Sequence, residues 1–394
     1  MEIIEMLYKL LPLVQGFIYP NEIELHWGLL IVLYPYITGL VAGAFILASL
    51  ARVFNVSEVK PTYRLSLLTA LAFLLVATLP LLAHLGHPER AFEIFFTPKL
   101  DSAMAMFGFV YAWYLMAVLL LEIWFDYRAD FVMWSKTERG LKKWFYKILT
   151  LGVNNISAGA LELDEKIGRA ITVIGIPSAF LLHGYVGFIF GSVKANPWWS
   201  TPLMPIIFLM SAMVSGIAAV MLIYMVTQWL RRKIIDMKCL DTIGLYLFNI
   251  FVIDFSLEML DLIHRIYEAE ESFDIISLMM RSNLFWTQFV GQILVGTLVP
   301  ISLLGISFFF SAKPGARKKL YFISSILTLL GIFAMRWNVV VGGQLFSKSF
   351  LGFTTYKLNL IGAEAYIAAA IAVLPLFILA ALLYLLPPWE EENR

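Results

Sequence analysis

A single cysteine, Cys239, occurs in this chain of 394 residues, and histidine is almost as scarce, with five. An iron–sulfur cluster takes four cysteines, or two cysteines and two histidines in the Rieske type, and one cysteine cannot form an internal disulfide. Haem held between helices needs two facing axial ligands, for which His84 with His183 is the one conceivable pair. We therefore expect no metal site, haem or iron–sulfur cluster in this chain.

Motifs of nucleotide-driven and hydrolytic chemistry are also missing. The sequence contains no GxxxxGK[ST] phosphate loop, no HExxH zinc motif and no nucleophile elbow. Charged residues make up only 14% of the chain, and the formal net charge is +1. A balance so close to zero gives no reason to expect a nucleic-acid partner.

Hydrophobic residues, in contrast, make up 60% of the chain, and its mean hydropathy is +0.81. This composition predicts an all-α integral membrane protein, because membrane β-barrels show short alternating segments instead. A helix needs about 20 apolar residues to cross a ~30 Å hydrocarbon core. Nine segments satisfy this length, namely 27–51, 65–85, 103–125, 168–190, 203–230, 242–265, 284–310, 319–341 and 362–386. The expected fold is a bundle of nine to ten transmembrane helices.

The chain divides into four parts on this pattern. Residues 1–24 form an N-terminal segment, and because Glu5, Lys9 and Pro12 interrupt the apolar run at 3–19, we expect an interfacial amphipathic helix at 3–19 rather than a tenth crossing. Residues 25–190 and 203–341 are expected to form two four-helix bundles, followed by a peripheral C-terminal helix, 362–386. Small residues in TGLVAGAF at 38–45 and SAMVSGIA at 211–218 favour close helix packing.

Lysine and arginine indicate the orientation of these helices. Nineteen of the 29 lie in 52–64, 127–169, 231–238 and 312–319, which alternate spans place on one face. By the positive-inside rule that face is cytoplasmic, so the C-terminus is expected in the cytoplasm.

The segment FVIDFSLEMLDLIHR at 251–265 is unusual for a membrane span. Asp254, Glu258, Asp261 and Arg265 are spaced by four, three and four residues, which puts them on one helical face over about 16 Å. Charges inside a bilayer cost at least ~2.5 kcal/mol each and normally mark a proton or ligand pathway. The alternative interpretation is a stripe of carboxylates paired with Arg265 simply to hold the bundle together.

Other polar residues are expected at the same depth, in the outer half of the membrane. They come from several spans and comprise His84, His183, Gln288, Gln292, Arg336 and Asn338. A lone membrane histidine or arginine is more often a satisfied structural residue than a functional one. The convergence of several such groups with carboxylates changes that expectation and favours a protonatable pocket.

A quinone suits such a pocket, because its ring oxygens need hydrogen-bond partners and proton exchange while its tail remains in lipid. Its redox chemistry also requires electrons, and since this chain has no metal or flavin site, a partner must carry them. A cation- or proton-coupled secondary transporter that uses the acidic stripe is the alternative, with Pro177 and Pro300 interrupting spans in different halves. A simple membrane anchor would leave the carboxylates without a purpose.

Four segments in this order resemble the NrfD/PsrC family of quinone-interacting membrane subunits. They are WGLLIVLYPYITGLVAGAF in the first span, the loop LGHPERAFEIFFTPKLDSAM, the block HGYVGFIFGSVKANPWWSTPLMPIIFLMSAMVSGIA and the C-terminal RWNVVVGGQ. The resemblance covers almost the whole chain and is closest to the larger members of DsrP or HybB type, which are expected to have ten spans where we count nine. It implies a haem-free subunit of a respiratory complex in the cytoplasmic (inner) membrane of a bacterium or archaeon.

The resemblance also implies a partner and a set of site residues. It implies electron exchange between menaquinone and a ferredoxin-like iron–sulfur subunit on the outer face, with further redox subunits in the same complex. His183, Glu258 and Arg336 match the family's polar positions and, with His84, form the expected quinone site. Proton transfer is expected from Glu258 together with Asp254 and Asp261, whose roles rest on the acidic stripe alone.

Overall fold

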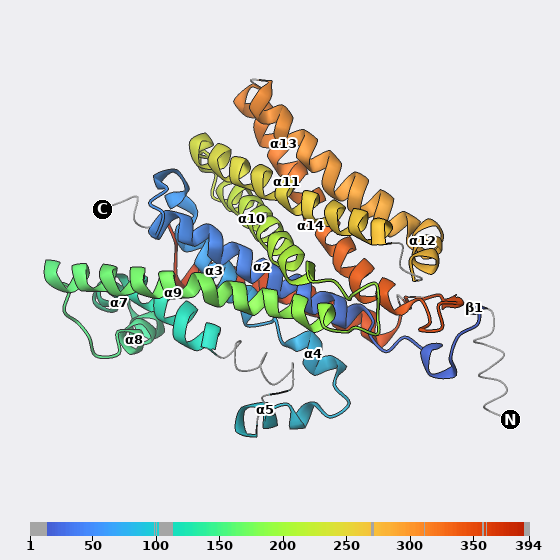
Figure 1. Cartoon of the computed structure of the whole chain (residues 1–394). Coiled ribbons are helices and arrows are strands. Elements are labelled where there is room, and N and C mark those ends of the chain that lie inside the picture. Colours follow the sequence, from blue (N-terminus) through green and yellow to red (C-terminus); the bar gives the residue numbers. More distant parts are fainter. Residues whose placement is uncertain are drawn as a thin grey trace.

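The computed structural model describes residues 14–97, 99, 101, 113–268, 272–310, 312–356, 358–359 and 361–389. Helices form almost all of its regular structure (Figure 1). The elements, in chain order, are β1 (Val14–Gly16), η2 (Pro20–Glu22), α2 (Leu29–Arg52), η3 (Ser57–Thr62), α3 (Tyr63–Leu74), α4 (Leu79–His84), η4 (Pro88–Arg90), α5 (Glu93–Phe96), η5 (Tyr114–Leu119), α7 (Leu120–Thr137), α8 (Gly140–Leu149), α9 (Ala158–Gly191), α10 (Met204–Leu230), α11 (Met237–Glu268), α12 (Phe273–Arg281), η6 (Phe285–Leu298), α13 (Val299–Phe309), α14 (Pro314–Val340), η7 (Gly342–Gln344), β2 (Gly352–Thr354) and α15 (Ala363–Leu385).

Eight helical segments among the described residues are long and apolar enough to cross a membrane. Each coincides with one of the nine predicted spans, so the all-α membrane fold is confirmed. The first part of the remaining prediction, 103–112, lies outside the described part of the chain, and 113–125 lies within it. From Tyr114 the chain is helical through η5 and α7, and the helix continues past the predicted end to Thr137.

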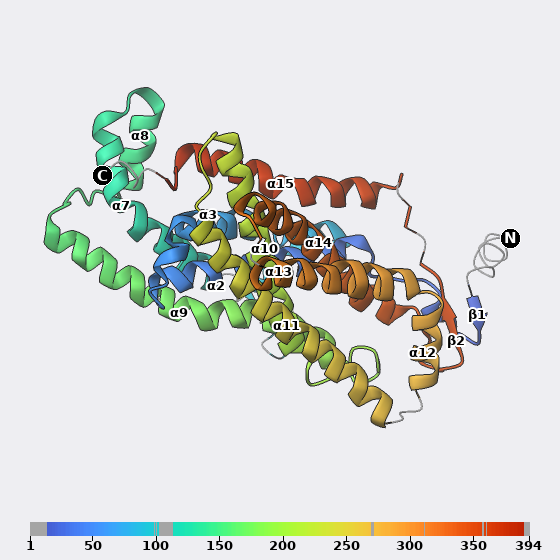
Figure 2. The same ribbon diagram turned by 90° about the horizontal axis from the view of Figure 1, so that it is seen from above.

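Helices α2 and α10 cross at the centre of the molecule, as both ribbon views show (Figures 1 and 2). They approach so closely at Gly43 and Gly216 that a Cβ on either residue would overlap the backbone of the other helix. The predicted role of the small residues in packing is therefore confirmed. Because α2 belongs to the first predicted bundle and α10 to the second, the two halves meet along this crossing. A second glycine contact, between Gly296 and Gly331, joins η6 to α14.

The basic connections gather at one end of the bundle. The connections α2–α3, α10–α11 and α13–α14 lie at the end opposite to β1 and α12 (Figure 1). At this basic end Arg64 of α3 bonds two carboxylates of α7, with Nε 2.7 Å from Asp126 Oδ2 and Nη2 3.0 Å from Asp130 Oδ2. These buried ion pairs fix α7 against α3.

The prediction for the N-terminal segment is wrong in its described part. Residues 1–13 lie outside the described residues, but Val14–Gly16 form a strand, β1, which pairs antiparallel with β2. Gly16 has a φ of +75°, which a helix cannot contain, and Pro20 follows at the start of η2. The backbone at Val14–Gly16 is therefore extended and not part of the helix expected at 3–19.

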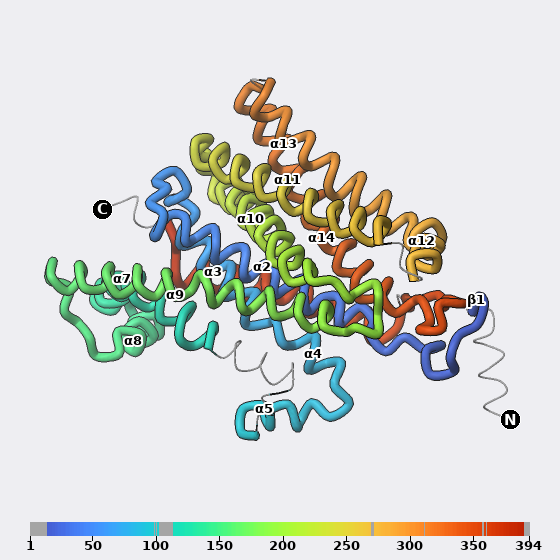
Figure 3. Tube along the Cα trace, viewed as in Figure 1, coloured from blue at the N-terminus to red at the C-terminus, as the bar shows by residue number. Residues whose placement is uncertain are grey.

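The connection between α9 and α10 lies at the same end as β2 and η7 (Figure 3). Hydrogen bonds tie this connection to α14 and the turn after it: Trp199 Nε1 donates to Val339 O at 2.6 Å, and Asn196 Nδ2 donates to Gly343 O at 2.6 Å. This end of the bundle, which the sequence assigns to the outer side, carries the polar side chains described next.

Candidate functional site

The acidic stripe of α11 faces the interior of the bundle. Asp254 is 1% exposed and Arg265 is buried, while Glu258 and Asp261 are half-buried. Large apolar residues on the other side of α11, such as Leu260 and Ile263, are exposed and suited to contact lipid. The helical spacing that defined the stripe in the sequence thus directs its polar groups into the protein interior and its apolar side chains outward.

Arg336 of α14 lies at the centre of the polar cluster and is fully buried. Its Nη2 is 3.0 Å from His183 Nε2 on α9, and it also donates to Ser211 Oγ at 2.7 Å and Phe208 O at 3.3 Å on α10. The guanidinium carbon lies 4.0 Å from the centroid of the Phe208 ring. Arg336 therefore joins three transmembrane helices at one point.

The stripe contributes two carboxylates to the surroundings of Arg336. Both Asp254 and Glu258 interact electrostatically with its guanidinium. Asp254 Oδ1 has no hydrogen-bond partner among the described residues although it is buried. A buried carboxylate that lacks hydrogen bonds is expensive unless a nearby cation compensates it, and Arg336 is placed to do so.

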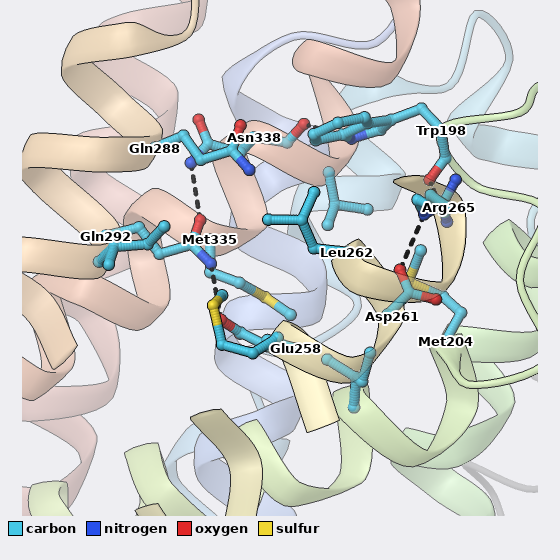
Figure 4. A pocket seen from close by; sticks show the side chains of 14 residues that line it. Trp198, Met204, Glu258, Asp261, Leu262, Arg265, Gln288, Gln292, Met335 and Asn338 are labelled. Carbon is cyan, nitrogen blue, oxygen red and sulfur yellow. Dashed lines mark hydrogen bonds and ion pairs between the residues drawn. The ribbon is translucent and has the colours of Figure 1, made fainter. Parts of the chain in front are cut away.

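A cavity of about 100 Å³ lies between α10, α11, η6 and α14, beside this cluster (Figure 4). It is lined by Trp198, Met204, Ile207, Glu258, Met259, Asp261, Leu262, Arg265, Gln288, Gln292, Ile293, Met335, Asn338 and Val339. Whole-ligand pockets usually measure roughly 300–1,000 Å³, so this cavity suits a head group rather than a complete large molecule. Its wall combines apolar side chains with a few polar groups, as in binding sites for small molecules.

The polar side of the cavity is a row of three side chains, drawn in Figure 4. Asn338 Nδ2 donates to Gln292 Oε1 at 2.8 Å, and Gln292 Nε2 donates to Glu258 Oε2 at 3.1 Å. The remaining amide oxygens, Asn338 Oδ1 and Gln288 Oε1, are buried without a partner among the described residues. Because buried polar atoms are nearly always hydrogen-bonded, these two oxygens are suited to accept hydrogen bonds from a ligand.

Asp261 and Arg265 close the cavity toward the outer end. Arg265 Nε lies 2.9 Å from Asp261 Oδ2 and its Nη2 donates to Trp198 O at 3.3 Å, while Thr201 Oγ1 donates to Asp261 Oδ1 at 2.5 Å. The Trp198 indole in turn donates to Asn338 O at 3.0 Å. Asp261 and Arg265 therefore hold the α9–α10 connection over the cavity.

The structure brings together most, but not all, of the residues that the sequence predicts. His183, Arg336, Asp254 and Glu258 form one cluster, although of these only Glu258 lines the cavity. His84 ends α4, is exposed, and makes no contact with this cluster in the described part of the chain. Both ring nitrogens of His183 face other side chains, which leaves neither directed at a haem.

Sequence reasoning named Gln288, Gln292 and Asn338 among the polar groups of the spans but assigned them no role. The signal was available, because two glutamines four residues apart share one face of an otherwise apolar span. Trp198 was missed, since nothing in the sequence of a connecting loop indicates which membrane helix it covers.

The comparisons with known proteins agree with this architecture. The family described as "Polysulphide reductase, NrfD" matches residues 20–348. A selenate reductase subunit of Mesobacillus selenatarsenatis is 33% identical over 325 residues, which cover 80% of this chain and 73% of that protein. The Hdr-like menaquinol oxidoreductase integral membrane subunit of Archaeoglobus fulgidus is 23% identical over 350 residues, covering 87% of this chain and 77% of that protein. A putative dimethyl sulfoxide reductase membrane subunit of Halobacterium salinarum is 30% identical over 198 residues, covering 50% and 42%.

Proposed function

The chain belongs to the NrfD family of integral membrane proteins, and on this premise we propose that it binds menaquinone or menaquinol near the outer face and exchanges electrons with an iron–sulfur partner subunit. Relatives of this chain are membrane subunits of multi-subunit reductases, so a role as the membrane subunit of a respiratory complex follows from the family. The quinone, the partner and the residues named below belong to the proposal.

The observation that carries the proposal is the cavity with a carboxylate and an amide row on one wall and apolar side chains on the others. A quinol ring presents two hydroxyl groups, which can donate to unpartnered oxygens such as those of Asn338 and Gln288. Its oxidation to quinone releases two electrons and two protons. Glu258 is the acceptor on the cavity wall for those protons, and its half-exposed position leaves it accessible from the bundle surface.

His183 and Arg336 act in this proposal from behind the cavity wall. They are fully buried and bonded to one another, so they hold α9, α10 and α14 in place, and the charge of Arg336 acts on Asp254 and Glu258. Proton exchange passes from Glu258 toward Asp254, the other carboxylate that interacts with Arg336. Asp261 takes part less directly, because its oxygens are bonded to Arg265 and Thr201. His84 is left out of the proposed site.

The electron-carrying partner is expected at the outer end, over the α9–α10 connection. Trp198 belongs both to this connection and to the cavity wall, so a subunit docked there would lie next to the bound ring. The chain's positive-inside pattern supports this orientation, with the C-terminus in the cytoplasm of a bacterial or archaeal cell.

Purification tests the proposal against the alternative of a secondary transporter. We expect the chain, extracted in mild detergent, to co-isolate with an iron–sulfur subunit, further redox subunits and bound menaquinone, and to pass electrons from menaquinol to that subunit. A chain that isolates alone, lacks quinone and catalyses cation-dependent uptake in vesicles would overturn the proposal in favour of transport.

A further inference from the structure

A groove of about 550 Å³ lies between α10 and α14 at the basic end, far along both helices from the cavity at Glu258. Its lining consists of Met225, Val226, Trp229, Ile235, Lys318, Lys319, Phe322 and Ile323. Apart from the two lysines, all of these side chains are apolar. Val226, Phe322 and Ile323 are each more than one-third exposed, so the groove is open along its side.

The two lysines differ from their neighbour in the same turn. Arg317 is paired, with Nη2 3.1 Å from Asp241 Oδ2, whereas no ion pair joins Lys318 or Lys319 to an acid in the described part of the chain. Both stand in the first turns of α14, at the start of the candidate membrane span Pro314–Gln344. The groove therefore has a cationic rim at the level of lipid head groups and an apolar floor that continues toward the membrane interior.

We propose that this groove is a binding site for an anionic phospholipid of the adjacent leaflet. The phosphodiester would lie against Lys318 and Lys319, and an acyl chain would follow Val226, Phe322 and Ile323. Basic pockets between transmembrane helices on the cytoplasmic side attract anionic head groups, and an apolar groove in the hydrocarbon region must be filled by lipid or protein. Trp229 is 73% exposed at the rim, the level at which tryptophan is enriched in membrane proteins.

The chemistry of the rim favours this occupant over a quinol. A quinol head needs hydrogen-bond acceptors, and the side chains of the lining supply only donors, namely the two lysine ammonium groups and the Trp229 indole. The site is independent of the proposed function, because it lies at the opposite end of α10 and α14 from the Glu258 cavity.

Lipid binding to the full-length protein, isolated with whatever subunits accompany it and stripped of lipid, tests the proposal. Native mass spectrometry would compare phosphatidylglycerol with phosphatidylcholine of identical acyl chains. We expect phosphatidylglycerol to bind more tightly, and the double variant K318Q/K319Q to lose roughly 30-fold in affinity for it, since each lysine near an anionic lipid contributes about five-fold. The control K143Q/K147Q removes two exposed lysines of α8 and should leave the preference unchanged.

A second variant and a second probe complete the test. Val226→Trp keeps both lysines but fills the floor, so it should weaken binding of phosphatidylglycerol and not of its chain-free head group, glycerophosphoglycerol. Equal binding of the two lipids by the unaltered protein would overturn the proposal. So would full retention of the preference in K318Q/K319Q, or head-group binding as tight as that of the whole lipid.

Discussion

Arg336 Nη2 and His183 Nε2 lie 3.0 Å apart in the interior of the bundle. A guanidinium has no acceptor, so Nε2 must accept this hydrogen bond, and His183 is a neutral imidazole with its proton on Nδ1. That nitrogen faces Thr38 Oγ1 at 3.3 Å, and Thr38 donates its own hydroxyl proton to Tyr34 O at 3.0 Å. The hydrogen bonds are thus donated in one direction, from α14 through α9 to α2. This direction fixes the tautomer of His183.

The positive charge of Arg336 acts on the carboxylates of α11. Because His183 is neutral, the groups that interact electrostatically with Arg336 are Asp254 and Glu258. The hydrogen bonds of the guanidinium, in contrast, go to His183 on α9 and to Ser211 on α10. This positive charge next to the cavity offsets part of the cost of burying a carboxylate at Glu258, the group that accepts a proton in the proposed function.

Replacing Glu258 with glutamine tests that role. Glutamine keeps an oxygen that can accept from Gln292 Nε2, so the row along the cavity and the assembly should survive. Proton exchange would be lost, and because positioned acid–base groups contribute about 10²–10⁴-fold, we expect quinol-dependent electron transfer to fall at least ~100-fold. Turnover of the purified complex with a soluble quinol analogue measures this.

The matched control is Glu268→Gln at the end of the same helix. Glu268 is exposed and lies 3.3 Å from His264, away from the cavity. Its variant should retain full turnover. Unchanged turnover in the Glu258 variant would remove that carboxylate from the mechanism.

Sequence reasoning was most successful where one helix determines the answer. The stripe of α11 follows from spacing alone, and the small residues of α2 and α10 indicated close packing, although not that these two helices pack on each other. It failed where position depends on other helices: His84 has the right depth but the wrong neighbours, and the strand at Val14–Gly16 exists because β2, more than 300 residues away, pairs with it. Neither relationship leaves a local pattern in the sequence.

Replacing Asn338 with leucine tests the amide row. The change removes the donor to Gln292 Oε1 but keeps the backbone oxygen that accepts from the Trp198 indole. Because Gln292 Oε1 is left without a donor and a ligand contact is lost, we expect the KM for quinol to rise about ten-fold. This corresponds to about 1.4 kcal/mol of binding free energy, and the effect on kcat should be smaller. Steady-state kinetics measure this. Asn249→Leu, on the exposed side of α11, is the control, and an equal KM in both variants would contradict the prediction.

Replacing Arg336 with methionine tests the charge balance of the cluster. The variant removes the cation that acts on the buried Asp254, and leaving a buried charge uncompensated costs about 3–5 kcal/mol of stability. We expect Asp254→Asn to restore part of that loss when the two changes are combined, because a neutral amide needs no counter-ion. Thermal unfolding in detergent of the four proteins of this double-mutant cycle gives the coupling. Strictly additive losses would show that the two side chains do not interact.

Replacing Gly216 with alanine tests the crossing of α2 and α10. The added Cβ would overlap backbone atoms of Gly43 and Ala44, which cannot rotate away as a side chain could. Forcing such a contact typically costs about 1–3 kcal/mol, more than the ~1 kcal/mol that alanine gains over glycine in a helix. Gly184→Ala is the matched control, since its added Cβ meets no heavy atom within 4 Å beyond its chain neighbours and its own helix backbone, so that only the gain in helix propensity remains. We therefore expect the unfolding temperature to fall for the Gly216 variant and to stay equal or rise for the Gly184 variant. Parallel shifts in both would mean that the helices can separate at this point without loss, and that α2 and α10 are not the packing centre of the bundle.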